Sequence, residues 1–327
     1  MPRDRPERVA RRRAHRHAPG RRLAGLSAPA GPGRAERRPH RQQHRRHRVT
    51  YRTILLHLDE GPGVDRRTDA AIQLAVAHDA HLIALHAPTP LYLQWSPEAG
   101  IREEIEASRK AEDDAVAKAA LERFEAAAAK AGLAGREARR ARGEPRDLLG
   151  LHGRYADLIV MGQADPKGGS AREAASIVED VILACGRPVL VVPYIGALQA
   201  IGRRILVAWD ASREASRAVA DALPLLQRAD KVTVVTVDAR PSESGHGQMP
   251  GADLALYLAR HGIEVEAAHV GSSGIGVGDV LLNQASDRDA DLIVMGCYGH
   301  ARLRELILGG ATRTMLRTTP VPLLMAH

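Results

Sequence analysis

The chain has 327 residues, 47 Lys and Arg against 39 Asp and Glu, and a formal net charge of +8. Residues 1–50 hold 16 Arg and three acidic residues, which leaves 31 of the basic and 36 of the acidic residues to the rest of the chain. Because the excess of basic residues is confined to residues 1–50, a broad nucleic-acid-binding surface on the rest of the chain is not expected. Two cysteines are too few for a disulfide framework. No apolar run approaches the roughly 18 residues of a membrane span. We expect a cytoplasmic protein without a membrane partner.

Residues 1–50 combine Arg clusters with Pro, Gly and five His, and they contain no aromatic residue. Such a segment buries too little apolar surface to offset chain entropy, so we expect a disordered leader. Clustered Arg neutralises phosphates, but no aromatic side chain is present to stack on a base. Because residues 49–56 run directly into a strand pattern, and a valine codon can initiate translation in bacteria, we favour a chain that starts near Val49.

The remaining chain is a tandem repeat. Residues 54–59 return as residues 205–210, and residues 157–162 return nearly letter for letter as residues 291–296. Further along, residues 188–191 match residues 322–325. Three matches in the same order indicate a duplication, and we expect one domain at residues 51–196 and a second at residues 201–327.

Each copy alternates strands and helices. The first copy fits the order of the second and has a longer second helix, from about residue 97 to residue 131. Continuous apolar strands separated by helices predict an α/β fold, with an open, mainly parallel, five-stranded Rossmann-like sheet in each domain. In the second copy we expect strands at 204–209, 231–237, 264–270, 291–295 and 321–326, and helices at 213–226, 254–261, 279–286 and 306–317.

Glycines gather directly after the strand expected at 291–295. Gly296, Gly299 and Gly309 follow the spacing Gly-x2-Gly-x9-Gly. Ligands of open α/β sheets bind beyond the carboxyl ends of the strands, and free backbone N–H groups at a helix start attract anions. The segment is therefore a candidate phosphate cradle, and the alternative is a set of glycines that only form tight turns.

The order of elements, Asp210 at the end of the first strand and the glycine spacing resemble the universal stress protein family in its tandem two-domain form, over residues 51–327. The resemblance implies an adenine nucleotide alpha hydrolase-like fold, with ATP, ADP or AMP bound in the second domain, with or without Mg²⁺. Nucleotide-binding members carry Ser or Thr after the last glycine, where this chain has Gly310. The binding residues that the resemblance implies are Ala208, Asp210, Val237, Gly296, Gly299, Gly309, Gly310 and Ala311.

Three further side chains are candidates for phosphate contacts: Arg302, Arg304 and Thr312. For the two arginines, a solvated or domain-interface position is the alternative. The first copy keeps Asp59 but has Asp165 where the second glycine of the pattern belongs. A carboxylate there would repel a phosphate, so we expect a degenerate site and a packing role for this copy.

Motifs for catalysis or metal binding are absent from the sequence. It contains no Gly-x4-Gly-Lys-Ser/Thr loop, no Gly-x-Ser-x-Gly elbow and no paired Cys or His at zinc spacing. Cys297 is either a redox-responsive thiol or a small side chain that fills the glycine loop. We expect a regulatory stress-response protein that is no enzyme, or at most a weak ATPase. The alternative is a module that binds no nucleotide and acts by pairing, either of its two domains or as a homodimer through the last strand, residues 321–326.

Overall fold

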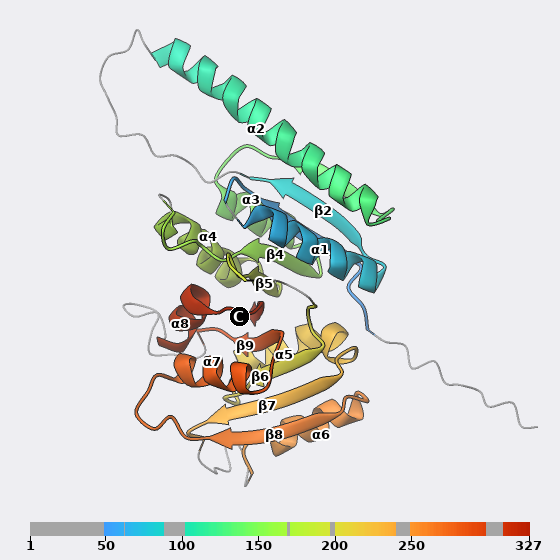
Figure 1. The fold of residues 1–327 in the computed structure, drawn as a ribbon, viewed down its shortest axis with the longest axis vertical. Coiled ribbons are helices and arrows are strands. Elements are labelled where there is room, and N and C mark those ends of the chain that lie inside the picture. Colours follow the sequence, from blue (N-terminus) through green and yellow to red (C-terminus); the bar gives the residue numbers. More distant parts are fainter. Residues whose placement is uncertain are drawn as a thin grey trace, which may run out of the picture. The chain divides into compact units, whose positions relative to one another are not determined.

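The computed structural model describes residues 49–61, 63–87, 102–168, 171–196, 200–239, 249–298 and 310–327. Strands and helices alternate along these residues (Figure 1). The leader expected at residues 1–50 lies outside them, except for Val49 and Thr50.

The first repeat has five strands and four helices among its described residues, and its second helix is the longest of the four. The elements are β1 (Thr53–Leu58), α1 (Val64–His78), β2 (His81–His86), α2 (Arg102–Lys130), β3 (Arg136–Arg140), α3 (Pro145–Gly153), β4 (Leu158–Gly162), α4 (Ala171–Ala184) and β5 (Val189–Val192).

The second repeat follows the same order. Its elements are β6 (Arg204–Ala208), α5 (Arg213–Leu226), β7 (Lys231–Val237), α6 (Ala252–Arg260), β8 (Val265–Val270), α7 (Val277–Asp287), β9 (Leu292–Gly296), α8 (Gly310–Thr318) and β10 (Leu323–Ala326). The start of the helix expected at residues 306–317 lies outside the described residues, within which α8 begins at Gly310.

The strands form a ten-stranded sheet in the order β3-β2-β1-β4-β5-β10-β9-β6-β7-β8. Neighbours are parallel except β5 and β10, which pair antiparallel with Leu323 opposite Val191 and Met325 opposite Val189. The predicted α/β class with a mainly parallel, five-stranded sheet in each repeat is confirmed, and the two sheets are joined edge to edge. β10 has β5 on one side and β9 on the other, so it offers no free edge for the homodimer that the sequence suggested.

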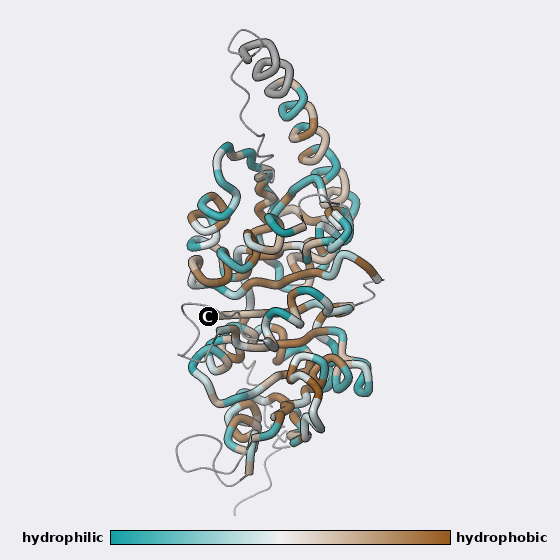
Figure 2. The backbone as a smooth tube through the Cα atoms, turned by 90° about the vertical axis from the view of Figure 1, so that its left-hand side faces the viewer, coloured by the Kyte–Doolittle hydropathy of each residue, from teal (hydrophilic) through white to brown (hydrophobic). Residues whose placement is uncertain are grey.

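Both faces of the sheet are covered by helices. Along β1, Ile54 and Leu56 pack into one hydrophobic cluster with residues of α1, α2, α5 and α6, while Leu55 packs into a second cluster with residues of α3, α4, α7 and α8. Successive strand residues point to opposite faces, so a strand buried on both faces needs the continuous apolar run seen in the sequence. Hydrophobic residues accordingly follow the strands through the middle layer (Figure 2).

The repeated aspartate directly before β4 and β9 accepts hydrogen bonds from the backbone at the start of the neighbouring strand. Asp157 accepts hydrogen bonds from the backbone N–H groups of Arg52 (2.7 Å) and Thr53 (2.9 Å). Asp291 accepts them from Gly202, Arg203 and Arg204 at 2.9–3.1 Å. The aspartate that begins each of the near-identical segments therefore holds the neighbouring strand in register. Sequence analysis did not assign it this role.

Polar contacts also join the repeats away from the sheet. The Tyr51 hydroxyl, which is buried, donates to the carbonyl oxygen of Asp221 at 2.8 Å. At the end of β4, the Gln163 side-chain amide donates to the Thr319 carbonyl oxygen at 3.2 Å. Gln163 is the residue directly after β4, so the strand end of the first repeat contacts the second.

Candidate functional site

The carboxyl ends of β6, β7 and β9 lie at one edge of the second repeat. The registers place Ala208 beside Met295 of β9 and beside Val235 of β7. Ala208, Val237 and Gly296 are all half-buried there. Because β7 lies on one side of β6 and β9 on the other, this is the switch point at which open α/β sheets bind ligands. The structure therefore brings three of the predicted site residues together.

Asp210 follows β6 and is exposed. Its Oδ1 accepts a hydrogen bond from the backbone N–H of Ser212 at 3.0 Å, and no ion pair engages this carboxylate among the described residues. The turn leads into α5, whose first N–H groups are capped by the Ser212 hydroxyl, which accepts from the Ala215 backbone N–H at 3.1 Å. Asp210 can thus accept a further hydrogen bond from a ligand.

Gly296 allows α5 to approach the end of β9. A Cβ atom on Gly296 would lie 2.3 Å from the Ala215 backbone nitrogen and 2.4 Å from the Glu214 carbonyl carbon. Only glycine fits against this backbone. The glycine expected to line a ligand is therefore required by packing, and the packing brings the N-terminus of α5 to the site edge, where its dipole favours negative charge.

The start of α8 supplies the remaining described site residues. Gly310 is exposed, no atom of the described residues lies within 4 Å of the position of a Cβ there, and Ala311 is half-buried. Thr312 is 5% exposed and shares the buried side of the helix with Met315. Gly299, Gly309, Arg302 and Arg304 lie outside the described residues.

Glu214 is a buried carboxylate near this edge that sequence analysis did not single out. It is 4% exposed, and its Oε1 accepts a hydrogen bond from Nε of Arg213 at 2.5 Å. Burial alone would raise the pKa of Glu214, but the hydrogen bond from Arg213 holds the pKa below its ordinary value. The pair keeps this negative charge compensated beside a candidate anion site.

The two residues after Gly296 are held against the core. Cys297 is 1% exposed, and burial raises the pKa of its thiol, with the Glu214 charge adding to the effect. A thiol of this kind is unreactive, which supports the loop-filling interpretation. Tyr298 has a left-handed backbone (φ 60°), a ring edge-on to His327, and a buried hydroxyl without a hydrogen-bond partner.

The equivalent edge of the first repeat is filled by an ion pair. Arg67 of α1, 3% exposed, donates to both carboxylate oxygens of Asp59, at 2.6 Å and 3.4 Å. Burial alone would raise the pKa of Asp59, but the guanidinium holds it well below its usual range. Nδ1 of His57 lies 3.9 Å from the same carboxylate. Sequence analysis missed Arg67, although its place among the buried positions of α1, with Ala70, Ala71 and Leu74, was a readable signal.

The loop after β4 is a folded turn. Asp165, the acid in place of the second glycine, accepts a hydrogen bond from the backbone N–H of Lys167 at 2.9 Å. Its own carbonyl oxygen accepts from Gly168 at 2.9 Å. Together with the contact of Gln163 to the second repeat, this turn agrees with a packing role for the first copy.

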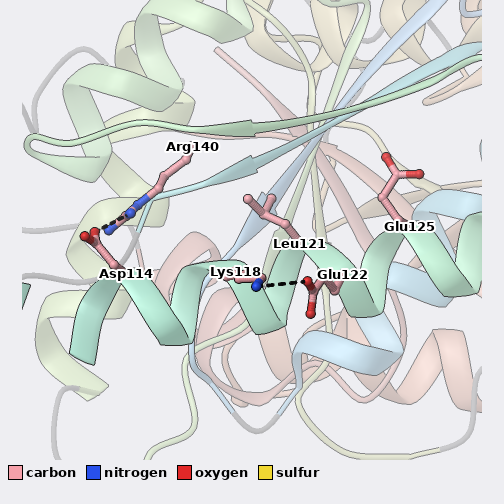
Figure 3. A pocket seen from close by; sticks show the side chains of 6 residues that line it. All are labelled: Asp114, Lys118, Leu121, Glu122, Glu125 and Arg140. Atoms are coloured by element: carbon pink, nitrogen blue, oxygen red, sulfur yellow. Dashed lines mark ion pairs between the residues drawn. The ribbon is translucent and has the colours of Figure 1, made fainter. Parts of the chain in front are cut away.

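A groove of about 400 Å³ lies between α2 and β3 (Figure 3). Its charged residues pair with each other or with a neighbour: Asp114 with Arg140, Lys118 with Glu122, and Glu125 with Arg136. Leu121 supplies the apolar part of the lining. No unpaired charge is left in the groove to select a ligand, so we do not assign it a site.

The described residues show neither a membrane-spanning helix nor a metal-binding cluster. No helix among them is both long and apolar enough to cross a membrane. They also contain no group of three or more His, Cys, Asp or Glu arranged to hold a metal ion.

Known proteins that resemble this chain share its repeated architecture. Residues 50–193 and 202–327 each match the Universal stress protein family. Universal stress protein Slr1230 of Synechocystis sp. (strain ATCC 27184 / PCC 6803 / Kazusa) is 28% identical over 174 residues, which are 51% of this chain and 57% of that protein. The chain thus spans a little over half the length of this curated relative.

Two solved structures show the same fold. A universal stress protein from Archaeoglobus fulgidus superposes with a TM-score of 0.61 at 20% identity, over 84% of this chain and 97% of that one. A putative universal stress protein from Pseudomonas aeruginosa superposes with a TM-score of 0.50 at 14% identity, over 84% and 93%.

Proposed function

Because the chain belongs to the universal stress protein family, we propose that it is a regulatory binding protein of the stress response whose second repeat binds an adenine nucleotide. The observation that carries the proposal is the convergence of Ala208, Asp210, Val237 and Gly296 at the switch point of the second sheet. ATP, ADP and AMP share the adenine, ribose and phosphate groups that this edge would recognise.

Each part of the nucleotide has a chemical counterpart among these residues. Ala208 and Val237 offer half-buried apolar surface to adenine. Asp210, exposed and free of an ion pair among the described residues, would accept a hydrogen bond from a ribose hydroxyl. Backbone N–H groups at the start of α8, at Gly310 and Ala311, would face the phosphates, as helix starts do in other phosphate sites.

The residue after Gly309 limits the affinity that we expect. Gly310 provides no hydroxyl for a phosphate oxygen, so binding depends on backbone groups and on the proposed contacts from Gly299, Gly309, Arg302, Arg304 and Thr312. Mg²⁺ would enter with the phosphates, because the described edge offers one open carboxylate, Asp210. Phosphate oxygens are the ligands that Mg²⁺ usually takes together with one or two carboxylates.

We assign the first repeat, residues 51–196, a structural role beside the second, residues 201–327. The antiparallel pairing of β5 with β10 and the contact of Gln163 with Thr319 support this role. In solution the two repeats would then take the place of a homodimer. The free, buried state of both cysteines agrees with a reducing compartment such as the cytoplasm.

The proposal is tested by releasing bound nucleotide from purified protein by denaturation and identifying it by mass spectrometry, followed by calorimetric titration with ATP, ADP and AMP. Asp210→Ala should weaken binding, while Asp69→Ala, an exposed aspartate of the first repeat, should not. Absence of released nucleotide together with absence of heat on titration would refute nucleotide binding and leave the fold untouched.

The second candidate is an interaction module that binds no nucleotide, and the lack of a hydroxyl at Gly310 is the observation that favours it. Its expected signature is a change of oligomeric state or partner binding that no nucleotide affects. Light scattering with and without ATP separates the two: a nucleotide-dependent mass supports regulation by ligand, and an unchanged mass with no heat of binding supports the module.

A further inference from the structure

The strand-end edge of the first repeat contains a buried cation. Arg67 reaches from α1 to the carboxyl ends of β1 and β4, where it pairs with Asp59. A Cβ atom on Gly162, the last residue of β4, would lie 2.2 Å from Nη1 of Arg67. The guanidinium therefore lies between the two strand ends that flank the switch point of this repeat.

The second repeat keeps the aspartate and the glycine of this arrangement but lacks the arginine and the histidine. When the two copies are aligned on Asp59 and Asp210, alanines of the second repeat, Ala208 and Ala218, take the positions of His57 and Arg67. Asp210 is exposed and unpaired among the described residues, whereas the Asp59 side chain is 17% exposed and bonded to the guanidinium. The same aspartate thus faces an internal cation in one copy and solvent in the other.

We propose that Arg67 determines the specificity of the first repeat by acting as a built-in ligand. Its guanidinium occupies the switch point and pairs with Asp59. This edge is therefore a cation site, and the cation that fills it is a side chain of the same protein. Because the guanidinium and Asp59 compensate each other's charge, a phosphate-bearing ligand would have to compete with Asp59 for the guanidinium. The statement about the second repeat, that alanine at position 218 keeps its edge open, rests on the proposed nucleotide binding.

The residues around the Arg67–Asp59 pair accommodate the buried guanidinium. Gly162 leaves room for the guanidinium in its present position. Nε2 of His57 donates a hydrogen bond to the Ala87 carbonyl oxygen, 2.8 Å away, which fixes the ring beside Asp59. Nε of Arg67 is buried without a hydrogen-bond partner. A buried charge that is partly unsatisfied costs stability, so we infer that its retention serves the exclusion of ligands.

The first test is chemical rescue of Arg67→Ala. Removing the side chain leaves Asp59 unpaired, and we expect a melting temperature lower by about 10 °C. Free guanidinium, at concentrations far below those that unfold proteins, should raise the melting temperature of Arg67→Ala while leaving the wild type unchanged or lowering it. Sodium at equal ionic strength is the control for screening.

Arg66→Ala is the matched control variant. Arg66 is the preceding residue and donates to the Pro193 carbonyl oxygen at 3.2 Å, away from Asp59. Guanidinium should not rescue it. Equal responses of the two variants to guanidinium, or wild-type stability of Arg67→Ala, would overturn the proposal.

A double-variant cycle covers the case in which Arg67→Ala does not fold. Asp59→Asn combined with Arg67→Met removes both charges, and we expect this double variant to be more stable than either single variant. Additive losses from the two substitutions would show that the residues do not act as a pair. None of these measurements contains a nucleotide, so they stand if the proposed function fails.

The reciprocal substitution links the two repeats. Ala218→Arg should place a guanidinium near Asp210, and we expect it to reduce nucleotide affinity at least tenfold, with Ala220→Arg, an exposed position of the same helix, as control. Loss of binding in Ala218→Arg alone supports the specificity role. Unchanged binding in a protein that does bind nucleotide would contradict the part of the proposal that concerns the second repeat.

Discussion

The two repeats end their first strand with the same residue type and use it in opposite ways. Asp59 is bonded to Arg67, and His57 lies 3.9 Å away. Asp210 is exposed and accepts one backbone hydrogen bond, from Ser212. At the neighbouring strand end, Gly162 makes room for a side chain, whereas Gly296 makes room for the backbone of α5. The same aspartate and glycine thus have different roles in the two repeats.

This difference shows how a duplicated sheet can separate its tasks. The registers and the hydrophobic clusters are similar in both halves, so the change lies in side chains that reach the strand ends. In the first repeat the Arg67 guanidinium is an internal partner for Asp59. Gln163, which follows Gly162 at the neighbouring strand end, contacts the second repeat. Small residues in the second repeat leave its aspartate open.

Asp59→Ala and Asp210→Ala should differ most. Loss of Asp59 leaves the Arg67 guanidinium, whose side chain is 4% exposed, as an uncompensated buried charge, and we expect a loss of about 3–5 kcal/mol in the free energy of unfolding. Asp210 is exposed, so the same change there should cost about 0.5 kcal/mol or less. Urea denaturation of both variants measures the contrast, and equal losses would contradict it.

Acid should destabilise the protein through the first repeat. Burial, with the Arg228 charge as a second cause, lowers the pKa of His78 from 6.5 to about 4. The unfolded chain binds a proton at this ring between those values and the folded chain does not, so stability falls as the pH falls through this window, by up to about 3 kcal/mol.

The variant His78→Gln should flatten this pH dependence between pH 6.5 and 4, while His81→Gln, at an exposed position, should not. Thermal melts across the pH range measure the slope. Among its described residues, the second repeat has no buried histidine. A slope that persists in His78→Gln at its full size would assign the acid sensitivity to another group.

Gly296→Ala should displace α5 from the end of β9. The added Cβ would lie 2.3 Å from the Ala215 backbone nitrogen, and overpacking of this kind costs about 1–3 kcal/mol. Gly150→Ala in α3 is the matched control, because a Cβ there meets no atom within 4 Å and alanine favours a helix by roughly 0.5–1 kcal/mol. A Gly296 variant as stable as the wild type would show that the glycine is not required for packing.

Much of the fold was predictable because duplication leaves a readable trace. The matching segments around residues 54, 157 and 188 revealed the repeated order of elements along the chain, and the apolar runs indicated a mainly parallel sheet. The joining of β5 to β10 was not predictable, because an apolar edge strand does not specify its partner. Arg67 was missed since an arginine in a helix normally reads as solvated, and its burial depends on Asp59 and Gly162 from two other strands.

Gly310→Ser should strengthen the second site and leave the first repeat unchanged. No atom of the described residues lies within 4 Å of a Cβ at this exposed helix start, so a serine there displaces none of them. A hydrogen bond from a hydroxyl to a charged phosphate is worth about 1.5–3 kcal/mol, and we expect at least a tenfold gain in nucleotide affinity by calorimetry. Gly310→Ala adds the methylene without the hydroxyl and should leave affinity near that of the wild type. If Ser and Ala give the same affinity, the start of α8 does not contact phosphate, and the backbone cradle proposed for the second repeat is wrong.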